Sequence, residues 1–203
     1  TIYDRNGVVL AESEKNDKGQ LRLYPFGKLY SQVIGYNSVV YGKSLLELSY
    51  NKYLLGLDEY SKLLDAFTKS SGNMREGGSL HTTIDHSIQK LADKLMGKRN
   101  GAIAAIVPET GEVIALVSKP DFSPDEASLS NRWDEMIESE NKPFLPRATQ
   151  GLYAPGSTYK AAIAALAIEN GLGGLEFDDN GSVMIDGRYF SNHNKKAYGK
   201  IDI

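Results

Sequence analysis

The chain contains no cysteine, which excludes a disulfide framework and a zinc site built on cysteine ligands. Its three histidines, His81, His86 and His193, follow no common metal-binding spacing, so lone surface or loop histidines are expected. Every apolar run is shorter than the roughly 18 residues that a membrane-spanning helix needs. The net charge of −3 gives no basic excess of the kind nucleic-acid binders carry, so no nucleic-acid partner is expected.

The sequence also lacks an initial methionine and a signal peptide. It opens directly on Thr1-Ile2-Tyr3, which predicts a piece of a longer protein. What is present is an ordinary globular composition, with 41% hydrophobic and 24% charged residues in a chain of 203. That length suffices for one large domain or two small ones.

The first part of the chain alternates short apolar stretches with turn signals. Asp4-Arg5-Asn6-Gly7 predicts a turn that feeds a strand at residues 8–10. Residues 13–20 are polar and charged, and they predict a loop. Residues 58–68 fit an amphipathic helix with its apolar residues Leu63, Leu64 and Phe67 inward. Small polar residues and glycines then crowd residues 69–78, which predicts a turn or domain junction there.

The second part is more regular. Asp85 is a good N-cap for a helix whose inward face would be Ile88, Leu91, Ala92 and Leu95. Residues 102–107 are a continuous apolar run typical of a buried strand, and residues 113–117 are its expected hairpin partner. The long polar stretch 119–147 contains four prolines and predicts a loop, which at that length is often functional.

Ser157 and Lys160 follow this stretch with the spacing Ser-x-x-Lys. The spacing alone is weak evidence for a catalytic serine, because three other copies exist, at Ser49…Lys52, Ser87…Lys90 and Ser139…Lys142. Those copies fall in a tyrosine-rich stretch, on a solvated helix face and in a charged loop. The copy at Ser157 differs, because Pro155-Gly156 precedes it and the apolar residues 161–168 follow it. This context predicts a sharp entry into a buried helix.

At the first turn of such a helix, residues three apart face the same side, so the Lys160 amine could reach the Ser157 oxygen. The helix N-terminus favours a developing alkoxide or oxyanion. A lysine withdrawn from water loses proton affinity and can serve as the general base for a serine nucleophile. The alternative is that Ser157 only caps the helix and Lys160 extends into solvent. This segment by itself leaves both interpretations open.

The octapeptide at residues 153–160, Tyr-Ala-Pro-Gly-Ser-Thr-Tyr-Lys, resembles the active-site motif of penicillin-binding proteins. Residues 80–85 with Gln89 are similar to the strand and helix that open their transpeptidase domain, and residues 102–118 resemble its first hairpin. Segments within residues 2–42 resemble the pedestal of class B members, among them Ile2-Tyr3-Asp4-Arg5-Asn6-Gly7, Tyr24-Pro25, Ile34-Gly35-Tyr36 and Tyr41-Gly42.

The resemblance implies an α+β chain. Residues 1–77 would be a partial pedestal, and residues 78–203 the N-terminal half of a transpeptidase domain of the serine β-lactamase-like type. The implied function is that of a peptidoglycan D,D-transpeptidase of cell-wall synthesis. Ser157 would be acylated by D-Ala-D-Ala stem peptides or β-lactam antibiotics, with Lys160 as its partner base, and no metal or organic cofactor is implied.

The family resemblance also implies a cellular location and partners. The location is the bacterial cell envelope, on the extracytoplasmic face of the cytoplasmic membrane, with a membrane anchor outside these residues. The expected partners are other cell-wall synthesis proteins. Two other functions stay open: a β-lactam sensor or serine β-lactamase relative, and a non-catalytic envelope scaffold that binds division or elongation proteins.

The sequence departs from the family in two later motifs. Every Ser-x-Asn spacing lies before Ser157, and no Lys-Thr-Gly occurs. Smaller departures are Leu45 and Pro146, which stand where the family usually has Gly and Asn. The missing motifs predict a chain that stops inside its catalytic domain, exposes apolar sheet or helix surface, and has weak activity or none.

Overall fold

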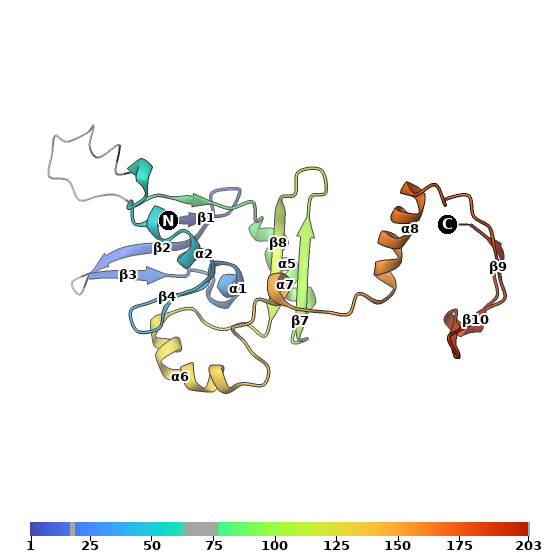
Figure 1. Cartoon of the computed structure of the whole chain (residues 1–203). Coiled ribbons are helices and arrows are strands. Elements are labelled where there is room, and N and C mark those ends of the chain that lie inside the picture. The colour runs from blue at the N-terminus through green and yellow to red at the C-terminus, as the bar shows by residue number, and fades with distance from the viewer. Residues whose placement is uncertain (17–18, 62, 64–76, 203) are drawn as a thin grey trace. The chain divides into compact units, whose positions relative to one another are not determined.

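The structure is a computed structural model that describes residues 1–16, 19–61, 63 and 77–202. The chain divides into two compact units, Thr1–Leu152 and Tyr153–Ile203, which are described one at a time (Figure 1). Both units contain helices and strands, and the predicted mixture of the two is confirmed. Among the described residues, no helix is both long and apolar enough to cross a membrane.

The first unit opens with a four-stranded sheet of order β3-β2-β1-β6. Its strands are β1 (Ile2–Tyr3), β2 (Val9–Asn16), β3 (Gly19–Leu23) and β6 (Leu80–His81). The predicted turn between β1 and β2 is confirmed, and Gly7 supplies its left-handed φ of +84°. β1 also pairs with β6 in parallel.

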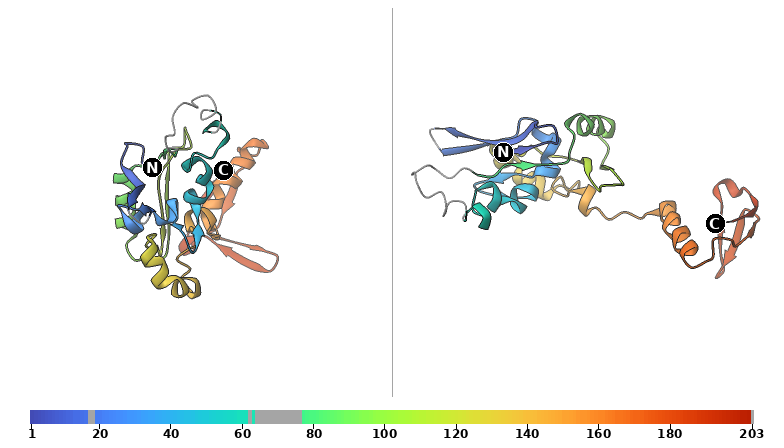
Figure 2. Two further views of the ribbon diagram at one scale, coloured as in Figure 1. Left: turned by 90° about the vertical axis from the view of Figure 1, so that its left-hand side faces the viewer. Right: turned by 90° about the horizontal axis from the view of Figure 1, so that it is seen from above.

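The loop predicted at residues 13–20 is wrong wherever these residues are described. They belong to β2 and β3, which pair in antiparallel register with Ser13 opposite Arg22 and Lys15 opposite Gln20. Figure 2 shows this two-stranded ribbon extending away from the part of the unit that contains residues 86–119. An antiparallel pair with solvated faces tolerates polar residues, so their polarity does not exclude a strand.

Short elements complete this part of the unit: η1 (Gly27–Tyr30), α1 (Ser31–Ile34), β4 (Asn37–Ser38), β5 (Gly42–Lys43), α2 (Leu45–Ser49) and α3 (Asn51–Leu54). η1 and α1 share a core with β1 and β2 that consists of Ile2, Leu10, Ala11, Tyr30, Ile34 and Ile84. Much of the helix predicted at 58–68, and residues 69–76 of the predicted junction, lie outside the described residues. Leu63, expected to face inward, is 55% exposed.

Asp4 is a fully buried carboxylate that ties the β1–β2 turn to helix α5 (His86–Met96). One carboxylate oxygen, Oδ1, accepts hydrogen bonds from the amides of Asn6 and Val8 at 2.7 and 2.8 Å. The other, Oδ2, accepts from the amide of His86 at 3.1 Å. The N-terminal amide of α5 is therefore satisfied by a side chain from the start of the chain.

Helix α5 begins at the predicted N-cap, where the Asp85 side chain accepts from the amides of Ser87 and Ile88. The predicted inward face is wrong except at Ala92. The residues that α5 buries are Gln89, Ala92 and Met96. The other expected residues, Ile88, Leu91 and Leu95, are 38%, 54% and 60% exposed. These residues are exposed because hydrogen bonds from Gln89 to the main chain of Leu116 turn a different face of α5 inward.

β7 (Gly101–Ile106) and β8 (Val113–Lys119) form the predicted antiparallel hairpin, on which α5 packs. The prediction that residues 102–107 form a buried strand is wrong for the hairpin as described, because none of these residues is buried and Ile106 is 54% exposed. Gln89 is fully buried and bonds to the main chain of Leu116 in β8. Its Oε1 accepts from the Leu116 N–H at 2.7 Å, and its Nε2 donates to the Leu116 carbonyl at 2.9 Å. These two bonds fix the rotation of α5 about its axis, since a buried amide has to be paired.

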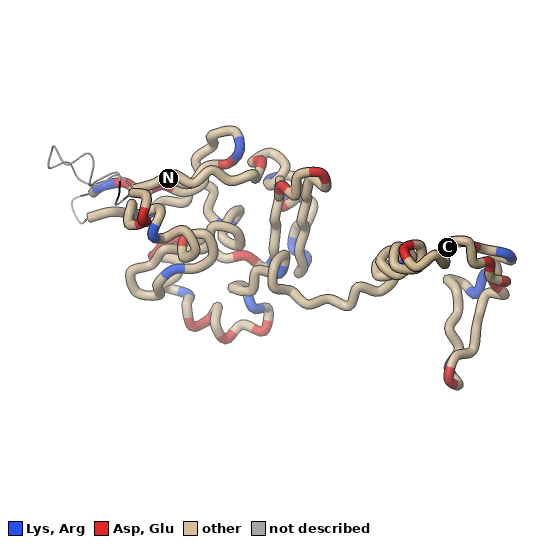
Figure 3. The backbone as a smooth tube through the Cα atoms, turned by 45° about the horizontal axis from the view of Figure 1, so that its top comes forward, with Lys and Arg blue, Asp and Glu red and all other residues tan. Residues whose placement is uncertain are grey.

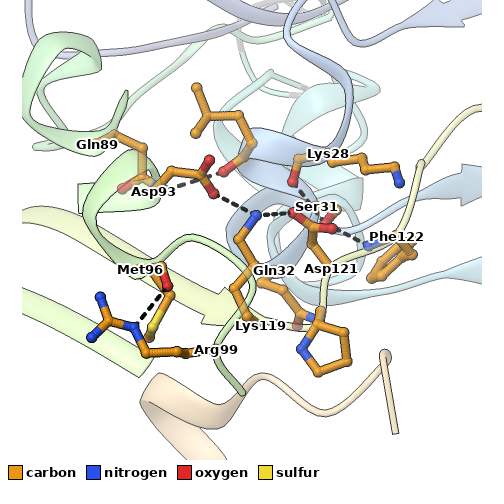
Figure 4. A network of polar contacts seen from close by, with 12 residues as sticks. Lys28, Ser31, Gln32, Gln89, Asp93, Met96, Arg99, Lys119, Asp121 and Phe122 are labelled. Atoms are coloured by element: carbon orange, nitrogen blue, oxygen red, sulfur yellow. Dashed lines mark hydrogen bonds and ion pairs between the residues drawn. The ribbon is translucent and has the colours of Figure 1, made fainter. Parts of the chain in front are cut away.

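A polar network lies where α5, β8 and η1–α1 meet (Figure 4). The Lys119 ammonium lies 2.7 Å from an Asp93 carboxylate oxygen and 2.5 Å from one of Asp121. Burial alone would lower the pKa of Lys119, but its bonds to the two carboxylates outweigh burial and raise that pKa. Figure 3 marks Lys, Arg, Asp and Glu along the backbone, and both signs of charge occur in each of the two units.

The loop predicted at residues 119–147 is wrong at its centre, where Glu126–Glu138 form helix α6. Leu129 and Met136 are buried, and Trp133 stacks on Tyr41 with 3.9 Å between ring centroids. The rest of this aromatic cluster is Tyr36, Phe122 and Phe144. The three apolar residues that α6 packs inward, Leu129, Trp133 and Met136, recur at helical spacing, a signal that the surrounding prolines and charges obscured.

Replacing the α6 N-cap, Asp125→Ala, is expected to lower the unfolding free energy by about 1 kcal/mol at neutral pH. Asp125 accepts from the Ser128 amide at 2.8 Å and from the Ser123 hydroxyl at 2.6 Å. Burial would raise the pKa of Asp125, but these bonds outweigh it and hold the pKa below its ordinary value. The stabilisation is therefore full above the ordinary aspartate pKa, and it is lost as the pH falls through the lowered folded-state value.

Urea unfolding at neutral and acidic pH, followed by the fluorescence of Trp133, the single tryptophan, measures this effect. Asp134→Ala is the matched control, since Asp134 is an exposed residue within the same helix. An equal loss in both variants, or a loss for Asp125→Ala that does not shrink in acid, would contradict the capping role.

The second unit contains one longer helix and two small sheets. The helical elements are η2 (Gly156–Thr158), α8 (Tyr159–Glu169) and η3 (His193–Lys195). The strands β10 (Ser182–Ile185) and β11 (Arg188–Ser191) pair in one sheet, and β9 (Phe177–Asp179) and β12 (Gly199–Ile201) pair in the other.

Candidate active site

The first unit ends in helix α7 (Arg147–Gln150), which three hydrogen bonds hold in place. The amide of Ala148 donates to the hydroxyl of the buried Ser118 at 3.0 Å. The Arg147 guanidinium donates to the Lys142 carbonyl at 3.1 Å and also to that of Asn141. Pro146 occupies the N-cap of α7, so the departure from the family's asparagine falls at a helix start, where a missing amide hydrogen is tolerated.

Ser157 lies at the middle of η2, and Lys160 is the second residue of α8. Thr158 and Tyr159 both have right-handed helical dihedrals, so the turn runs straight into the helix. Ser157 and Lys160 are therefore placed at one helix start with the predicted three-residue spacing. Both are exposed, and the hydrogen bonds of the described residues include none between their side chains.

The Pro155-Gly156 entry has the geometry that the sequence predicts. Gly156 adopts φ of +56°, in the left-handed region that an L side chain rarely enters. The Thr158 hydroxyl donates to the Pro155 carbonyl at 2.6 Å and closes the turn around Ser157. Sequence reasoning did not single out Thr158, although a Thr three residues after a Pro is the signal for such a bond.

The prediction that α8 is a buried helix is wrong for these residues. None of its side chains is buried, and Ile163, Leu166 and Ile168 are 49%, 56% and 59% exposed. The unit's two-stranded sheets are too small to cover a helix that is apolar on every side. The expectation that the chain exposes apolar helix surface is confirmed.

The other Ser-x-x-Lys copies lie in different surroundings. Ser87 and Lys90 are exposed on α5, as predicted, and Ser139 and Lys142 follow the end of α6. Ser49 ends α2 and Lys52 belongs to α3, so a helix break separates them. Only the copy at Ser157 starts an apolar helix. The described residues contain no group of three or more His, Cys, Asp or Glu that could hold a metal ion.

Two protein-family models match the chain in succession. The first, described as the penicillin binding protein A dimerisation domain, matches residues 1–80. The second, described as the penicillin binding protein transpeptidase domain, matches residues 101–203. The second range contains the Ser157–Lys160 pair and covers half of the chain.

Curated relatives carry related names. The chain is 33% identical over 181 residues to the peptidoglycan D,D-transpeptidase PbpA of Mycolicibacterium smegmatis, an alignment that covers 81% of this chain and 36% of that protein. It is 30% identical over 198 residues to the peptidoglycan D,D-transpeptidase MrdA of Acinetobacter baumannii, covering 83% of this chain and 28% of that protein. The chain thus spans about a third of the length of these relatives.

A solved structure matches nearly the whole chain. It is penicillin-binding protein A from M. tuberculosis, described as a penicillin G acyl-enzyme complex, with a TM-score of 0.87 and 26% identity. The match covers 99% of this chain and 50% of that one. The family models, the curated relatives and the solved structure thus all point to penicillin-binding proteins, as does the order of motifs along the chain.

Proposed function

Because the chain belongs to the class B penicillin-binding proteins, we propose that it carries the nucleophile of a peptidoglycan D,D-transpeptidase of cell-wall synthesis, Ser157, with Lys160 as its partner base. The observation that carries the proposal is the Ser157–Lys160 pair at the start of the apolar helix α8, inside the range that matches the transpeptidase domain. The other Ser-x-x-Lys copies lack this helix or this range.

The geometry supports an acyl transfer in two steps. Lys160 would take the proton of the Ser157 hydroxyl as Oγ attacks the carbonyl carbon between the two D-alanines of a stem peptide. The C–N bond breaks, D-alanine leaves with a proton, and the peptidyl group stays on Oγ as an ester. An amine of a second stem peptide then attacks the ester, forms the cross-link and returns the proton to Oγ. A β-lactam would acylate Oγ by opening its ring.

The start of α8 supplies one hydrogen-bond donor for the oxyanion that forms in this reaction. The Ser157 amide lies in the N-terminal turn, where the amides have no partner within the helix and the helix dipole is positive. Such an amide would stabilise the oxyanion of the tetrahedral intermediate. In the family, the second donor comes from the Lys-Thr-Gly strand, a motif that does not occur in these 203 residues.

The 203-residue chain is therefore expected to react with labelled penicillin about a hundredfold to a thousandfold more slowly than a polypeptide that continues through the Ser-x-Asn and Lys-Thr-Gly motifs. The reason is that one oxyanion donor is missing. A time course of labelling for both polypeptides measures the ratio. Rapid stoichiometric labelling of the 203-residue chain would overturn this expectation.

Membership of the family supports proposals for the ligands, the partners and the cellular location of the protein. We propose peptidoglycan stem peptides and β-lactams as its ligands, cell-wall synthesis proteins as its partners, and the extracytoplasmic face of the cytoplasmic membrane as its place. The M. tuberculosis relative, which binds penicillin G as an acyl-enzyme, supports the β-lactam assignment. The family models at residues 1–80 and 101–203 support a division into a pedestal-like region, 1–77, and a transpeptidase region, 78–203.

Labelled penicillin tests the function in the longer polypeptide. A covalent adduct is expected, and peptide mass spectrometry should locate it on the segment that contains Ser157. The match of residues 1–80 to a penicillin-binding protein A domain argues against a β-lactamase or sensor. The absence of any adduct would refute the proposal and favour a non-catalytic scaffold. An adduct found only on another residue would refute the assignment of Ser157 as the nucleophile.

A further inference from the structure

Ser118 is a buried polar residue of β8 whose neighbours on the strand are apolar. It is 4% exposed, and Ala115 and Val117 on the same strand are buried as well. A hydroxyl that is withdrawn from water is unfavourable unless it finds a hydrogen-bond partner. The partner of Ser118 is the main-chain amide of Ala148, 30 residues further along the chain, at 3.0 Å. β8 therefore uses this side chain to hold a segment outside the hairpin.

The segment that Ser118 holds is α7. A helix of four residues is not stable by itself, because its few main-chain bonds do not offset the ordering of the chain. Ala148 is its second residue, and the amides of a first turn have no acceptor within the helix. The Ser118 hydroxyl supplies that acceptor, and α7 lies against both strands of the hairpin (Figure 1).

The chain just before α7 is fixed by other side chains. The Arg147 guanidinium donates to the main-chain carbonyls of Asn141 and Lys142. The carbonyl of the buried Pro143 accepts a hydrogen bond from the Gln32 amide group. Between α7 and the hairpin, by contrast, the described residues make one hydrogen bond, and Ser118 supplies its acceptor. The contact of α7 with β8 therefore depends on this hydroxyl.

α7 leads directly to the proposed nucleophile. Residues 151–156 separate its last residue, Gln150, from Ser157. A chain spans at most about 3.6 Å per residue, so Ser157 stays within about 25 Å of Gln150. If α7 leaves the hairpin, the last anchored residue is Pro143, and the free chain that ends at Ser157 becomes twice as long. The contact of α7 with β8 thus narrows the range of positions open to Ser157.

On the basis of the function proposed above for Ser157, we propose that Ser118 is a positioning residue for the acylation of that serine. The Ser118 hydroxyl acts through α7: it holds the start of this helix on β8, so that the chain runs to Ser157 from a fixed point. Placement of a reacting group affects its rate strongly, since a displacement of about 1 Å can slow a reaction by about a hundredfold.

Ser118→Ala tests this role in a polypeptide that also carries the later family motifs. Its acylation rate constant at saturating labelled penicillin should fall by about tenfold, while the dissociation constant of penicillin before acylation changes by less than about twofold. Rapid-mixing time courses at several penicillin concentrations separate the two constants. Ser118→Thr keeps the hydroxyl on a residue that strands favour, and it should retain the rate constant of the unchanged polypeptide.

Thr149→Val is the matched control. The Thr149 hydroxyl donates to the Pro146 carbonyl at 3.2 Å, a bond at the start of α7 that does not reach β8. Thr149 is exposed, and the substitution removes one hydroxyl, as Ser118→Ala does. Its acylation rate constant should equal that of the unchanged polypeptide.

Limited proteolysis of the 203-residue chain measures the release of α7 independently of acylation. Trypsin cleaves after Arg147, at the peptide bond whose amide bonds to Ser118. In Ser118→Ala this cleavage should be about fivefold faster, because it follows the population of the released segment. Cleavage after Arg132, inside α6, is the internal reference and should not change.

Three results would overturn the positioning role: an unchanged acylation rate constant in Ser118→Ala, equal losses in Ser118→Ala and Thr149→Val, or unchanged cleavage after Arg147. A lower yield of adduct at an unchanged rate would also count against it, since that result reports only a loss of folded protein. If the unchanged polypeptide forms no adduct, the function proposed for Ser157 fails, and the role of Ser118 in acylation fails with it.

Discussion

Replacing Ser157 with alanine is expected to abolish covalent labelling by penicillin in a polypeptide that carries these residues and the later family motifs. The acyl group would have no oxygen to attach to, so the loss should be complete rather than partial. The fold should be unaffected, because the Ser157 side chain is exposed and makes no hydrogen bond among the described residues. Gel fluorescence of a labelled penicillin reads the first effect, and thermal unfolding reads the second.

Ser87→Ala is the matched control for this experiment. Ser87 also begins a Ser-x-x-Lys near the start of a helix, and it is exposed on α5. Its labelling should equal that of the unchanged protein. Labelling that survives Ser157→Ala would place the nucleophile elsewhere. Loss of labelling in both variants would show that the assay reports folding rather than chemistry.

Asp4→Ala is expected to produce a large loss of stability, about 3–4 kcal/mol of unfolding free energy. The substitution leaves the amides of Asn6, Val8 and His86 without their acceptor, and the site is fully buried. A hydrogen bond to a charged group contributes about 1.5–3 kcal/mol, and a buried donor without a partner is unfavourable. Urea unfolding of the 203-residue chain, read by Trp133 fluorescence, measures the loss.

Asp85→Ala is the appropriate comparison, because Asp85 also bonds to amides at the start of α5 but is more exposed. Its loss should be clearly smaller. Asp4→Asn should fall between the two, because an amide oxygen can still accept from part of the set while its NH2 group would face a donor. Equal losses for Asp4→Ala and Asp85→Ala would show that burial of the carboxylate contributes nothing.

Local signals allowed several elements to be predicted from the sequence. The turn at residues 4–7, the Asp85 cap and the β7–β8 hairpin each depend on neighbours within a few residues. The inward face of α5 depends instead on the bond from Gln89 to Leu116, which no periodicity encodes. The position of α6 depends on Tyr41 and Phe144, which lie far from Trp133 in sequence or across prolines.

In the candidate site, too, the features set by neighbouring residues were predictable and those set by distant residues were not. The turn at Pro155-Gly156 and the three-residue spacing of Ser157 and Lys160 are local, and both were predicted. The burial of α8 is not local, because it requires other elements to cover an apolar helix on every side. For that reason sequence patterns could distinguish the Ser157 copy from the other three Ser-x-x-Lys copies but could not establish its surroundings.

The bond between Gln89 and Leu116 has a consequence for hydrogen exchange. The Leu116 amide lies on the outer edge of β8, where exchange with solvent would ordinarily be rapid, yet its hydrogen is held by a buried side chain of α5. Its exchange therefore requires α5 to leave the hairpin rather than the hairpin to open. The protection of this one amide reports the free energy of α5 undocking, separately from the ladder amides shared by β7 and β8.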